Sequence, residues 1–384
     1  MKKVLIVASV ISFIEWFNKE NIEFLNDTLG CNVHVACNLD YMDDTDIEKT
    51  KQYLEQLNKK GVVLHNIHFA RNPLNPKNIK ALNKLKKIIN SNSFDLIHCH
   101  TPTASILTRI AAKKARKNGT VVMYTCHGFH FHKASPKKNW LIYYPIEKHF
   151  SKHCDYIVTI NHEDYAIAKT FKCENVRYIP GVGVDLNKIT NCRINKGSYK
   201  ESIGVPKDKL MLLSIGEMID RKNHQIIIKA LGKLHNPNIY YVICGKGPLK
   251  ESLHKLAIKY GIANNVVFLG FRRDIPELCN AADIGAFPSK IEGLGLAGIE
   301  IMAAGVPLVS SNVHGILDYV SDGQTGFACN PNDVDGFAKA ISRLSIDQSL
   351  RDDMKQRCLD ATKPFDIKNA LDEMWNIYRE VLRV

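Results

Sequence analysis

The sequence predicts an α/β protein built from two doubly wound parallel sheets, one in each half of the chain. Its 384 residues are too many for one hydrophobic core and favour two domains of roughly 150–200 residues. Apolar strand-like runs alternate with helical patterns, which is typical of a parallel sheet covered by helices on both faces. The alternation stops near residues 180–200 and then begins again.

The first half opens on a buried strand at residues 4–9, VLIVAS, after two lysines. This start imitates a signal peptide, but no small-residue cleavage site follows and Glu15 interrupts the apolar run. Strands and helices then alternate. Further strands are expected at 32–37, 62–69, 95–100, 120–127 and 156–160, and helices near 14–29, 77–90, 103–117 and 139–151.

A Gly- and Pro-punctuated segment, 175–185, and a polar stretch, 188–204, separate the two halves. The second series of strands follows, with helices between them, and the chain closes on one amphipathic helix after Pro364. The expected strands of this series are 210–216, 239–245, 266–271, 284–289 and 306–311.

Composition excludes several classes of protein. With 45% apolar and 24% charged residues the chain matches soluble globular proteins, and no apolar run approaches the ~20 residues that span a bilayer. Eleven scattered cysteines without a CxxC pair indicate reduced thiols in a cytoplasm. The histidines of HCH at 98–100 and HFH at 130–132 alternate at strand spacing, but further ligands at a suitable spacing are missing, so no metal is expected.

The net charge of +13 is unevenly placed. From Lys77 to Lys138 there are thirteen Lys or Arg residues and one acid, Asp95. For any single lysine a solvated helix face is the simpler interpretation. A whole region of one sign suits an anionic membrane surface or a phosphate-bearing partner. Nucleic acid is not expected, because the region has no recognised binding motif.

Two carboxylates bracket a glycine-rich turn in FPSKIEGLGLAGIEIMAAG. Gly293 and Gly295 let the backbone approach a ligand, and the start of the following helix favours a diphosphate. Glu292 and Glu300 are expected roughly 10–12 Å apart along the helix, where each can accept hydrogen bonds from a diol. Alternatively both face solvent, but a lone carboxylate on an apolar helix is costly without a partner. The layout fits a nucleoside diphosphate sugar.

Other strand ends carry weaker signals. Gly216 ends a strand before a helix start that offers N–H groups to an anion, and Lys222 follows where it can meet a phosphate. His127 ends the 120–127 strand before a glycine, a position from which it can reach across a cleft. His100 and Thr101, at the end of the neighbouring strand, are candidates to support it.

The stretch FPSKIEGLGLAGIEIMAAGVPLVSS resembles the E-x7-E signature of family-4 retaining glycosyltransferases, which have the GT-B fold of two facing Rossmann-like domains. SIGEMIDRKNHQ, ICGKGPLKESL, NVVFLGFRRDIPELCNAADIGAFPS and VSDGQTGFACNPND match in the same order. In the first half, IHCHTPTAS, YTCHGFHFHKASPKKNW and YIPGVGVD are similar to bacterial exopolysaccharide and capsule glycosyltransferases.

The resemblance implies a role for each matching donor-binding residue. Glu300 would hold the ribose hydroxyls and Glu292 the hydroxyls of the donor sugar. Lys222 would face the diphosphate, and the strand end at Gly270 and Phe271 would meet the base. Backbone amides that would also face the diphosphate are those of Gly293, Leu294, Gly295 and Leu296.

It also implies what each domain does. Residues 1–185 would bind the acceptor, residues 186–365 would bind the nucleotide sugar, and the helix 366–384 would cross back to the first domain. His127 would line the donor sugar from the first domain and join Lys222 and Glu292 as catalytic residues.

Two positions depart from the family pattern. The usual Gly-Arg of the phosphate loop is here Gly216–Glu217, so the second cation for the diphosphate is missing there. Arg221, beside Lys222, is the candidate replacement. The first strand also lacks the double glycine of many members, and VASVISFIEWFN stands in its place.

The expected reaction is retaining, metal-independent transfer of a hexosyl or N-acetylhexosaminyl residue from a UDP-sugar to an undecaprenyl-diphosphate-linked saccharide, in exopolysaccharide, capsule or O-antigen assembly. No cofactor is expected, and DVD at 333–335, which looks like a metal-binding DxD, follows a turn remote from these loops. The expected location is cytoplasmic and peripheral, at the inner face of the plasma membrane, through the basic region 77–138.

Three alternatives remain open at this point. A GT-B UDP-sugar epimerase would turn over the nucleotide sugar without an acceptor. A non-catalytic module would bind the nucleotide sugar and show no turnover. A nicotinamide dehydrogenase is disfavoured, because neither leading strand is followed by a full GxGxxG.

Overall fold

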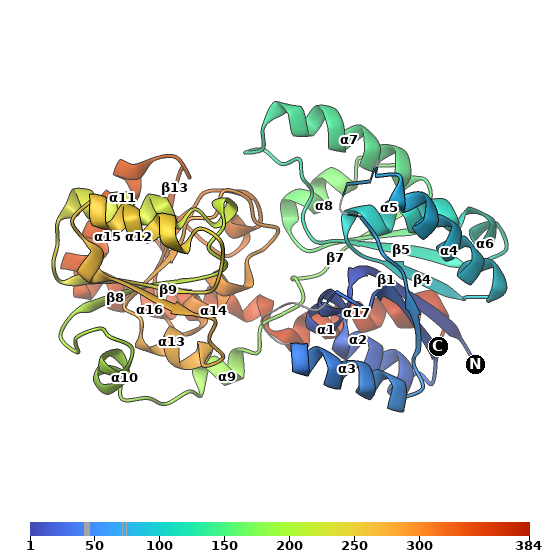
Figure 1. Ribbon diagram of the computed structural model, residues 1–384, viewed down its shortest axis with the longest axis horizontal. Coiled ribbons are helices and arrows are strands. Elements are labelled where there is room, and N and C mark those ends of the chain that lie inside the picture. Colours follow the sequence, from blue (N-terminus) through green and yellow to red (C-terminus); the bar gives the residue numbers. More distant parts are fainter. Residues whose placement is uncertain (42–46, 71, 74) are drawn as a thin grey trace. The chain divides into compact units, whose positions relative to one another are not determined.

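The computed structural model of the chain describes residues 1–41, 47–70, 72–73 and 75–384. The chain divides into two compact units, residues 1–182 with 369–384, and residues 183–368. Each unit has its own parallel sheet, and helices lie on both faces of each sheet (Figure 1). The predicted pair of doubly wound α/β halves is therefore confirmed. What each unit binds stays a prediction.

The described strands of the first unit follow the order β3-β2-β1-β4-β5-β6-β7. β1 pairs with both β2 and β4, so the strand order reverses beside β1, and ligands of such sheets bind at the carboxyl ends there. The strands are β1 (Lys3–Val10), β2 (Asn32–Asn38), β3 (Val63–Asn66), β4 (Leu96–Cys99), β5 (Val121–Cys126), β6 (Tyr156–Thr159) and β7 (Asn175–Tyr178).

Helices cover this sheet from both sides, with α4 and α5 on one face and α1, α2, α3 and α17 on the other (Figure 1). The apolar residues of α4, α5 and β4 meet in one core that includes Leu85, Ile97 and Leu107. The helices are α1 (Ile11–Phe17), α2 (Lys19–Glu23), a π-helical turn (Phe24–Thr28), α3 (Ile47–Lys59), α4 (Lys77–Ser91), α5 (Pro102–Ala111), α6 (Lys113–Lys117), α7 (Lys137–Ser151), α8 (His162–Ala168) and α17 (Ile367–Leu382).

The closing helix α17 packs on the first unit although it follows the second unit in sequence. The hydroxyl of Tyr378 lies 2.8 Å from Nδ1 of His98 on β4, and the ring of Trp375 stacks on Phe24 at 4.5 Å between centroids. Tyr378 is fully buried. Its burial holds the C-terminal helix against the sheet of the first unit.

The described strands of the second unit follow the order β10-β9-β8-β11-β12-β13. The strands are β8 (Leu210–Ile215), β9 (Ile239–Cys244), β10 (Val266–Gly270), β11 (Ile284–Phe287), β12 (Leu308–Ser311) and β13 (Gly326–Cys329). The helices are α9 (Leu186–Thr190), α10 (Lys196–Ser202), α11 (His224–Leu234), α12 (Lys250–Lys259), α13 (Ile275–Ala281), α14 (Leu296–Ala303), α15 (Val334–Ile346) and α16 (Gln348–Thr362).

Some elements differ from the expected ones. The helix expected at 14–29 is interrupted at Asn18, whose φ of −134° is not helical, and it continues as α2 and a π-helical turn. The edge strands β7 and β13 were not expected, because both are only partly buried and carry a weak apolar pattern. None of the described helices is long and apolar enough to cross a membrane.

The sequence predicts that the cations of the basic region 77–138 form an exposed surface of one charge, but two of the thirteen are engaged in ion pairs with other parts of the first unit. Arg109 is fully buried and pairs with Glu147 at 2.9 Å, and Arg116 pairs with Asp155 at 2.8 Å. The other eleven cations are lysines, and all of them are exposed. The single acid, Asp95, pairs with Lys2 at 3.2 Å. The exposed charge of the region is therefore carried by its lysines.

Candidate active site

The loop after β8 holds Gly216, Arg221 and Lys222. It ends in a 3-10 turn, Asp220–Lys222, and α11 begins at His224 rather than directly after the glycine. A Cβ atom on Gly216 would lie 3.3 Å from Cε of Lys222. The glycine therefore leaves room for the lysine side chain to cross the loop.

Hydrogen bonds tie this loop to the one after β11. The backbone N–H of Lys290 donates to the carbonyl of Arg221 at 2.8 Å, and the side-chain amide of Asn223 donates to the carbonyl of Pro288 at 3.1 Å. Nζ of Lys290 pairs with Asp220 at 2.7 Å. Asp220, Asn223 and Lys290 were not singled out from the sequence, because their role depends on two loops that are far apart along the chain.

Glu292 lies against both cations of the first loop. Its Oε2 accepts hydrogen bonds from Nζ of Lys222 at 2.7 Å and from Nη1 of Arg221 at 3.0 Å. The side chains of Glu292 and Lys222 are each 13% exposed. Burial alone would raise the pKa of Glu292, but the charges of Lys222 and Arg221 outweigh it and hold this pKa below its ordinary value. With two cations and one carboxylate, the cluster keeps a net positive charge that suits an anion.

The start of α14 requires a glycine. Gly295 precedes the helix with φ +86°, and a Cβ atom there would lie 2.5 Å from Cε1 of Phe287 and 2.8 Å from Cγ of Glu292. The N–H groups of Leu296 and Ala297, the first two of α14, have no acceptor within the helix and can bind an anion, whereas the N–H of Gly298 donates to the carbonyl of Gly295 at 3.0 Å. Because residues 293–295 are loop, the spacing of roughly 10–12 Å expected for the two glutamates does not apply. It assumed a helix that begins earlier.

Glu300 lies on α14 between the buried residues Ile299 and Ile301. Burial raises its pKa to about 7. In the described part of the chain no side chain or backbone group forms a hydrogen bond or ion pair with its carboxyl group. A partly buried carboxyl group without a protein partner is a position where a ligand hydroxyl can supply the missing hydrogen bonds.

The predicted base site at the end of β10 contains Gly270 and Phe271. Gly270 has φ +69° and its carbonyl accepts a hydrogen bond from the N–H of Gly245 at 2.8 Å. The side chain of Phe271 is exposed. Directly after it, Arg272 and Asp274 form an ion pair whose carboxylate also accepts a hydrogen bond from Tyr199 at 2.6 Å. Sequence reasoning missed this cluster, for which RRD after the strand is the only local signal.

In the first unit, His127 follows the carboxyl end of β5. Its Nε2 lies 3.1 Å from Nδ1 of His100, and the ring of Phe13 packs edge-on against it at 4.9 Å. Burial lowers the pKa of His127 to about 4. The imidazole is therefore neutral at pH 7 and can exchange hydrogen bonds with a ligand, but it supplies no positive charge.

Thr101, the other predicted neighbour, lies close to the end of β1, with its Oγ1 2.7 Å from Oγ of Ser9. The structure thus brings His100 and His127 together, and it places Thr101 beside the first strand. The role of His127 toward a donor sugar stays a prediction.

The DVD stretch at 333–335 contributes to the fold of the second unit. Oδ1 of Asp333 accepts a hydrogen bond from the N–H of Gly336 at 2.9 Å and so caps α15, and Asp335 pairs with Lys233. Within the described residues, no cluster of three or more His, Cys, Asp or Glu side chains could hold a metal ion.

Two family models match the chain, one in each half. The model described as "Glycosyltransferase Family 4" matches residues 20–188, and the one described as "Glycosyl transferases group 1" matches residues 195–358.

Curated relatives match over most of the chain. EpsD of Bacillus subtilis, a protein classed as a glycosyltransferase, is 33% identical over 98% of this chain and 96% of its own length. The UDP-Gal:alpha-D-GlcNAc-diphosphoundecaprenol alpha-1,3-galactosyltransferase of Escherichia coli is 29% identical over 80% of each chain.

Solved structures share the fold at lower identity. HepE of Anabaena, crystallised with UDP and glucose, superposes with a TM-score of 0.77 at 20% identity, over 99% of this chain and 100% of its own. Sucrose-phosphate synthase of Thermosynechococcus elongatus superposes with a TM-score of 0.73 at 18% identity, over all of both chains. These likenesses support the fold.

Proposed function

This chain belongs to the family-4 glycosyltransferases with the GT-B fold, and from that premise we propose that it transfers a hexosyl or N-acetylhexosaminyl residue from a UDP-sugar to an undecaprenyl-diphosphate-linked saccharide. We propose further that the anomeric configuration is retained and that no metal ion is needed. The product would be a lipid-linked intermediate of exopolysaccharide, capsule or O-antigen assembly.

The observation that carries the proposal is the cluster of Lys222, Arg221 and Glu292 beside the start of α14. It combines cations, a carboxylate and the first N–H groups of a helix, within two loops that hydrogen bonds hold together. A nucleoside diphosphate sugar offers the complementary groups, a diphosphate for the cations and N–H groups and sugar hydroxyls for the carboxylate. Glu300, further along α14, would accept hydrogen bonds from the ribose hydroxyls.

In the proposed reaction, the bond between the anomeric carbon and the β-phosphate oxygen breaks and UDP leaves with the bonding electrons. Lys222 and Arg221 would stabilise the charge that grows on the diphosphate, a contribution from groups already in place before the reaction. With these two cations beside the diphosphate, no divalent ion would be needed to stabilise its charge. Arg221 would supply the cation that Glu217 does not.

The acceptor hydroxyl would bond to the anomeric carbon on the face that UDP leaves, and its proton would pass to the departing phosphate oxygen. One glycosidic bond thus replaces one sugar–phosphate bond, and a proton is released with UDP. His127, neutral because of its burial, would position the donor sugar by hydrogen bonding.

Two observations support a lipid-linked acceptor. The E. coli relative, by its name, acts on GlcNAc-diphosphoundecaprenol. The eleven exposed lysines between residues 77 and 138 would attract an anionic lipid surface by about 1 kcal/mol per nearby charge. We therefore propose that the protein works as a peripheral protein at the inner face of the plasma membrane.

The proposal is tested with purified protein, five UDP-sugars (UDP-Glc, UDP-Gal, UDP-GlcNAc, UDP-GalNAc and UDP-GalA) and GlcNAc-diphosphoundecaprenol or membrane extract. One UDP-sugar should be consumed at least about tenfold faster with acceptor than without it. Turnover that is independent of acceptor would instead identify an epimerase or hydrolase, and tight UDP-sugar binding with no turnover would identify a binding module.

Lys222→Ala should lower kcat by about 10²–10³-fold, the usual effect of removing one group that stabilises charge in the transition state, with a smaller effect on UDP binding. Lys246→Ala, a variant of an exposed lysine in the turn after β9, is the matched control and should keep its rate. A wild-type rate in Lys222→Ala would contradict the role given to Lys222.

A further inference from the structure

The first unit contains a cavity of about 490 Å³ that none of the proposed donor-binding residues lines. Its volume falls within the range of about 300–1,000 Å³ of small-molecule sites. Its walls come from α5, α7, the loop after β5, the ends of β1 and β5, and residues 72–73, and they combine aromatic and aliphatic side chains with a few polar ones. They include Ile106, Phe129, Phe131, Tyr143, Ile146 and Glu147.

Glu147 is the carboxylate in this wall. Its side chain is 10% exposed, and its Oε2 accepts a hydrogen bond from Nη2 of Arg109 at 2.9 Å. Its second oxygen, Oε1, has no hydrogen-bond or ion-pair partner within the described residues, and it is not sealed from solvent. One oxygen is therefore held by the protein while the other remains available to a ligand.

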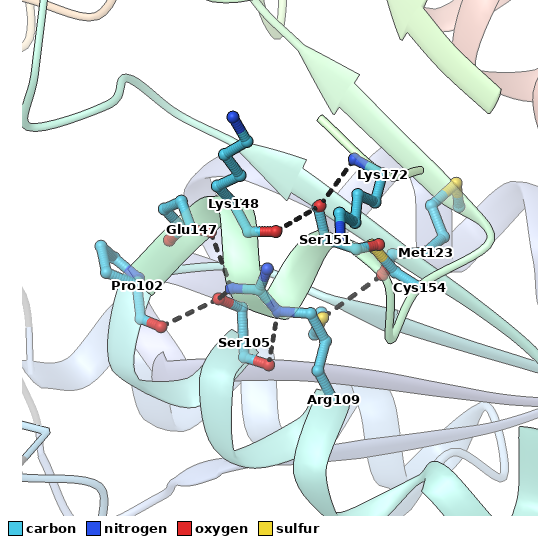
Figure 2. Close-up of polar contacts among 10 residues, drawn as sticks. Pro102, Ser105, Arg109, Met123, Glu147, Lys148, Ser151, Cys154 and Lys172 are labelled. Carbon is cyan, nitrogen blue, oxygen red and sulfur yellow. Dashed lines mark hydrogen bonds and ion pairs between the residues drawn. The ribbon is translucent and has the colours of Figure 1, made fainter. Parts of the chain in front are cut away.

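Arg109 holds Glu147 from behind the cavity wall. Figure 2 shows its guanidinium group between Ser105 and Glu147, with hydrogen bonds to both. The same group lies 4.5 Å from the ring centroid of Tyr124, and Arg109 is completely buried. The guanidinium group is thus fixed in direction by α5 and β5, and it fixes the carboxylate that faces the cavity.

As a link between α5 and α7, this ion pair contributes little to the free energy of folding. A buried ion pair rarely stabilises a fold more than apolar side chains of the same volume, and Nη1 of Arg109 is buried with no hydrogen-bond partner among the described residues. A role in placing a charged carboxylate at the cavity wall accounts for the pair better than stability does.

The side chains of the cavity wall indicate which class of ligand can bind. An ionised carboxylate only accepts hydrogen bonds, so the ligand must present O–H or N–H groups, and a phosphate would be repelled. At the rim, the rings of His130 and Tyr143 lie 4.8 Å apart, and Tyr143 is 37% exposed. Aromatic rings beside several hydrogen-bonding side chains, among which Glu147 is the carboxylate, suit a neutral sugar ring, which has apolar C–H faces and a hydroxylated edge.

We propose that this cavity binds a sugar ring of the acceptor saccharide, that Glu147 accepts hydrogen bonds from its hydroxyls, and that Arg109 acts as the positioning residue for Glu147. The inference rests on the proposed transferase function, because it names where the acceptor of that reaction binds. The diphosphate of a lipid-linked acceptor would lie outside the cavity, away from Glu147.

Binding is measured by saturation-transfer NMR with the methyl glycosides of glucose, galactose, GlcNAc and GalNAc, and catalysis by the KM for GlcNAc-diphosphoundecaprenol. Glu147→Gln leaves Arg109 without a counter-charge and can fail to fold, so the double variant Arg109→Leu/Glu147→Leu is made beside it. Tyr143→Ala removes an exposed ring at the rim, and Leu141→Ala, on the same helix but outside the cavity, is its control.

The wild type should give a saturation-transfer signal with at least one glycoside. The folded double variant and Tyr143→Ala should lose most of it and raise the acceptor KM by about tenfold or more, while UDP-sugar binding stays within about twofold. Leu141→Ala should match the wild type. An unchanged signal and an unchanged KM in a folded double variant would show that the ion pair has only a structural role. Absence of any glycoside signal from the wild type would also overturn the proposal.

These outcomes separate the two proposals. Glycoside binding that depends on Glu147, without transfer from any UDP-sugar, would remove the transferase proposal and leave a sugar site in the cavity. Transfer that proceeds with an unchanged acceptor KM in the double variant would do the reverse.

Discussion

At the scale of single residues, the two glutamates of the signature carry opposite electrostatic properties. Glu292 has two cationic partners, and its pKa lies below the ordinary value. Glu300 has none among the described residues, and burial raises its pKa to about 7. The same side chain is therefore a fixed charge in one position and a titrating group at physiological pH in the other.

Nucleotide binding should depend on pH through Glu300. The ribose hydroxyls donate hydrogen bonds, so the ionised carboxylate should bind them better. With a pKa near 7, ionisation rises from about a tenth at pH 6 to about nine-tenths at pH 8, and the affinity for the preferred UDP-sugar should rise about tenfold. Calorimetric titration measures this, and Glu300→Gln should bind more weakly with a flat profile. Equal pH slopes in both proteins would exclude Glu300 as the titrating group.

The same group should destabilise the fold at high pH. Because the pKa of Glu300 is raised on folding, the folded protein binds the proton more tightly, and the stability of the neutral form is lost as pH rises through 7. Glu300→Gln should therefore be more stable than the wild type, by a margin that grows by about 2 kcal/mol between pH 5.5 and pH 8.5. Urea unfolding at both pH values measures it. Glu251→Gln, an exposed control on α12, should show no such margin.

At the scale of elements, strand ends and loop ties determine the candidate site. α14 begins at Leu296 because Gly295 turns the chain in a left-handed conformation against Phe287. The loop after β8 lies beside it because Asn223 and Lys290 bond across to the neighbouring loop. The position of Lys222 against Glu292 is therefore a property of two elements together.

Gly295→Ala tests the start of α14. The added Cβ atom would overlap Phe287 and Glu292, and it would require a positive φ from a residue that resists it. UDP affinity should fall about tenfold or more, and stability should fall by more than the ~1 kcal/mol that the positive φ alone costs. Gly261→Ala is the matched control, since Gly261 has φ +69° and no atom of the described residues lies within 4 Å of the new Cβ. Equal losses in the two variants would show that contact with Glu292 does not matter.

At the scale of the whole molecule, charge is the property that relates the chain to a surface. The net charge of +13 includes the eleven exposed lysines of the basic region, five of which lie on α4. Arg109, which the sequence places in the same region, is buried and belongs to the interior. A run of basic residues thus contains both exposed lysines and an arginine that belongs to the interior, and the sequence run alone does not separate them.

The triple variant Lys80→Gln/Lys86→Gln/Lys87→Gln should weaken binding to vesicles that contain phosphatidylglycerol. Three lysines at about 1 kcal/mol each predict a loss of about 100-fold in partitioning at low salt, and the loss should shrink as salt screens the charges. Co-sedimentation measures it. Lys207→Gln/Lys250→Gln/Lys255→Gln, with exposed lysines of the second unit, removes equal net charge and should bind nearly as the wild type does. If both triple variants lose binding equally, only net charge matters.

The sequence by itself determined the doubly wound class, most of the strands and the stretch that bears the two glutamates. Continuous apolar runs such as VLIVAS can be read locally, because a strand buried on both faces must be apolar along its whole length. Glycines at strand ends also predict turns from the sequence alone, since few other residues can adopt their backbone conformations.

Only the tertiary structure decided which charges meet. Glu292 pairs with Arg221 and Lys222 from another loop, and Arg109 pairs with Glu147 from another helix. Glu300, by contrast, is surrounded by packing that gives it no partner among the described residues. A side chain's charge state and partners depend on the distance and burial that packing creates, and no local pattern of residues contains either.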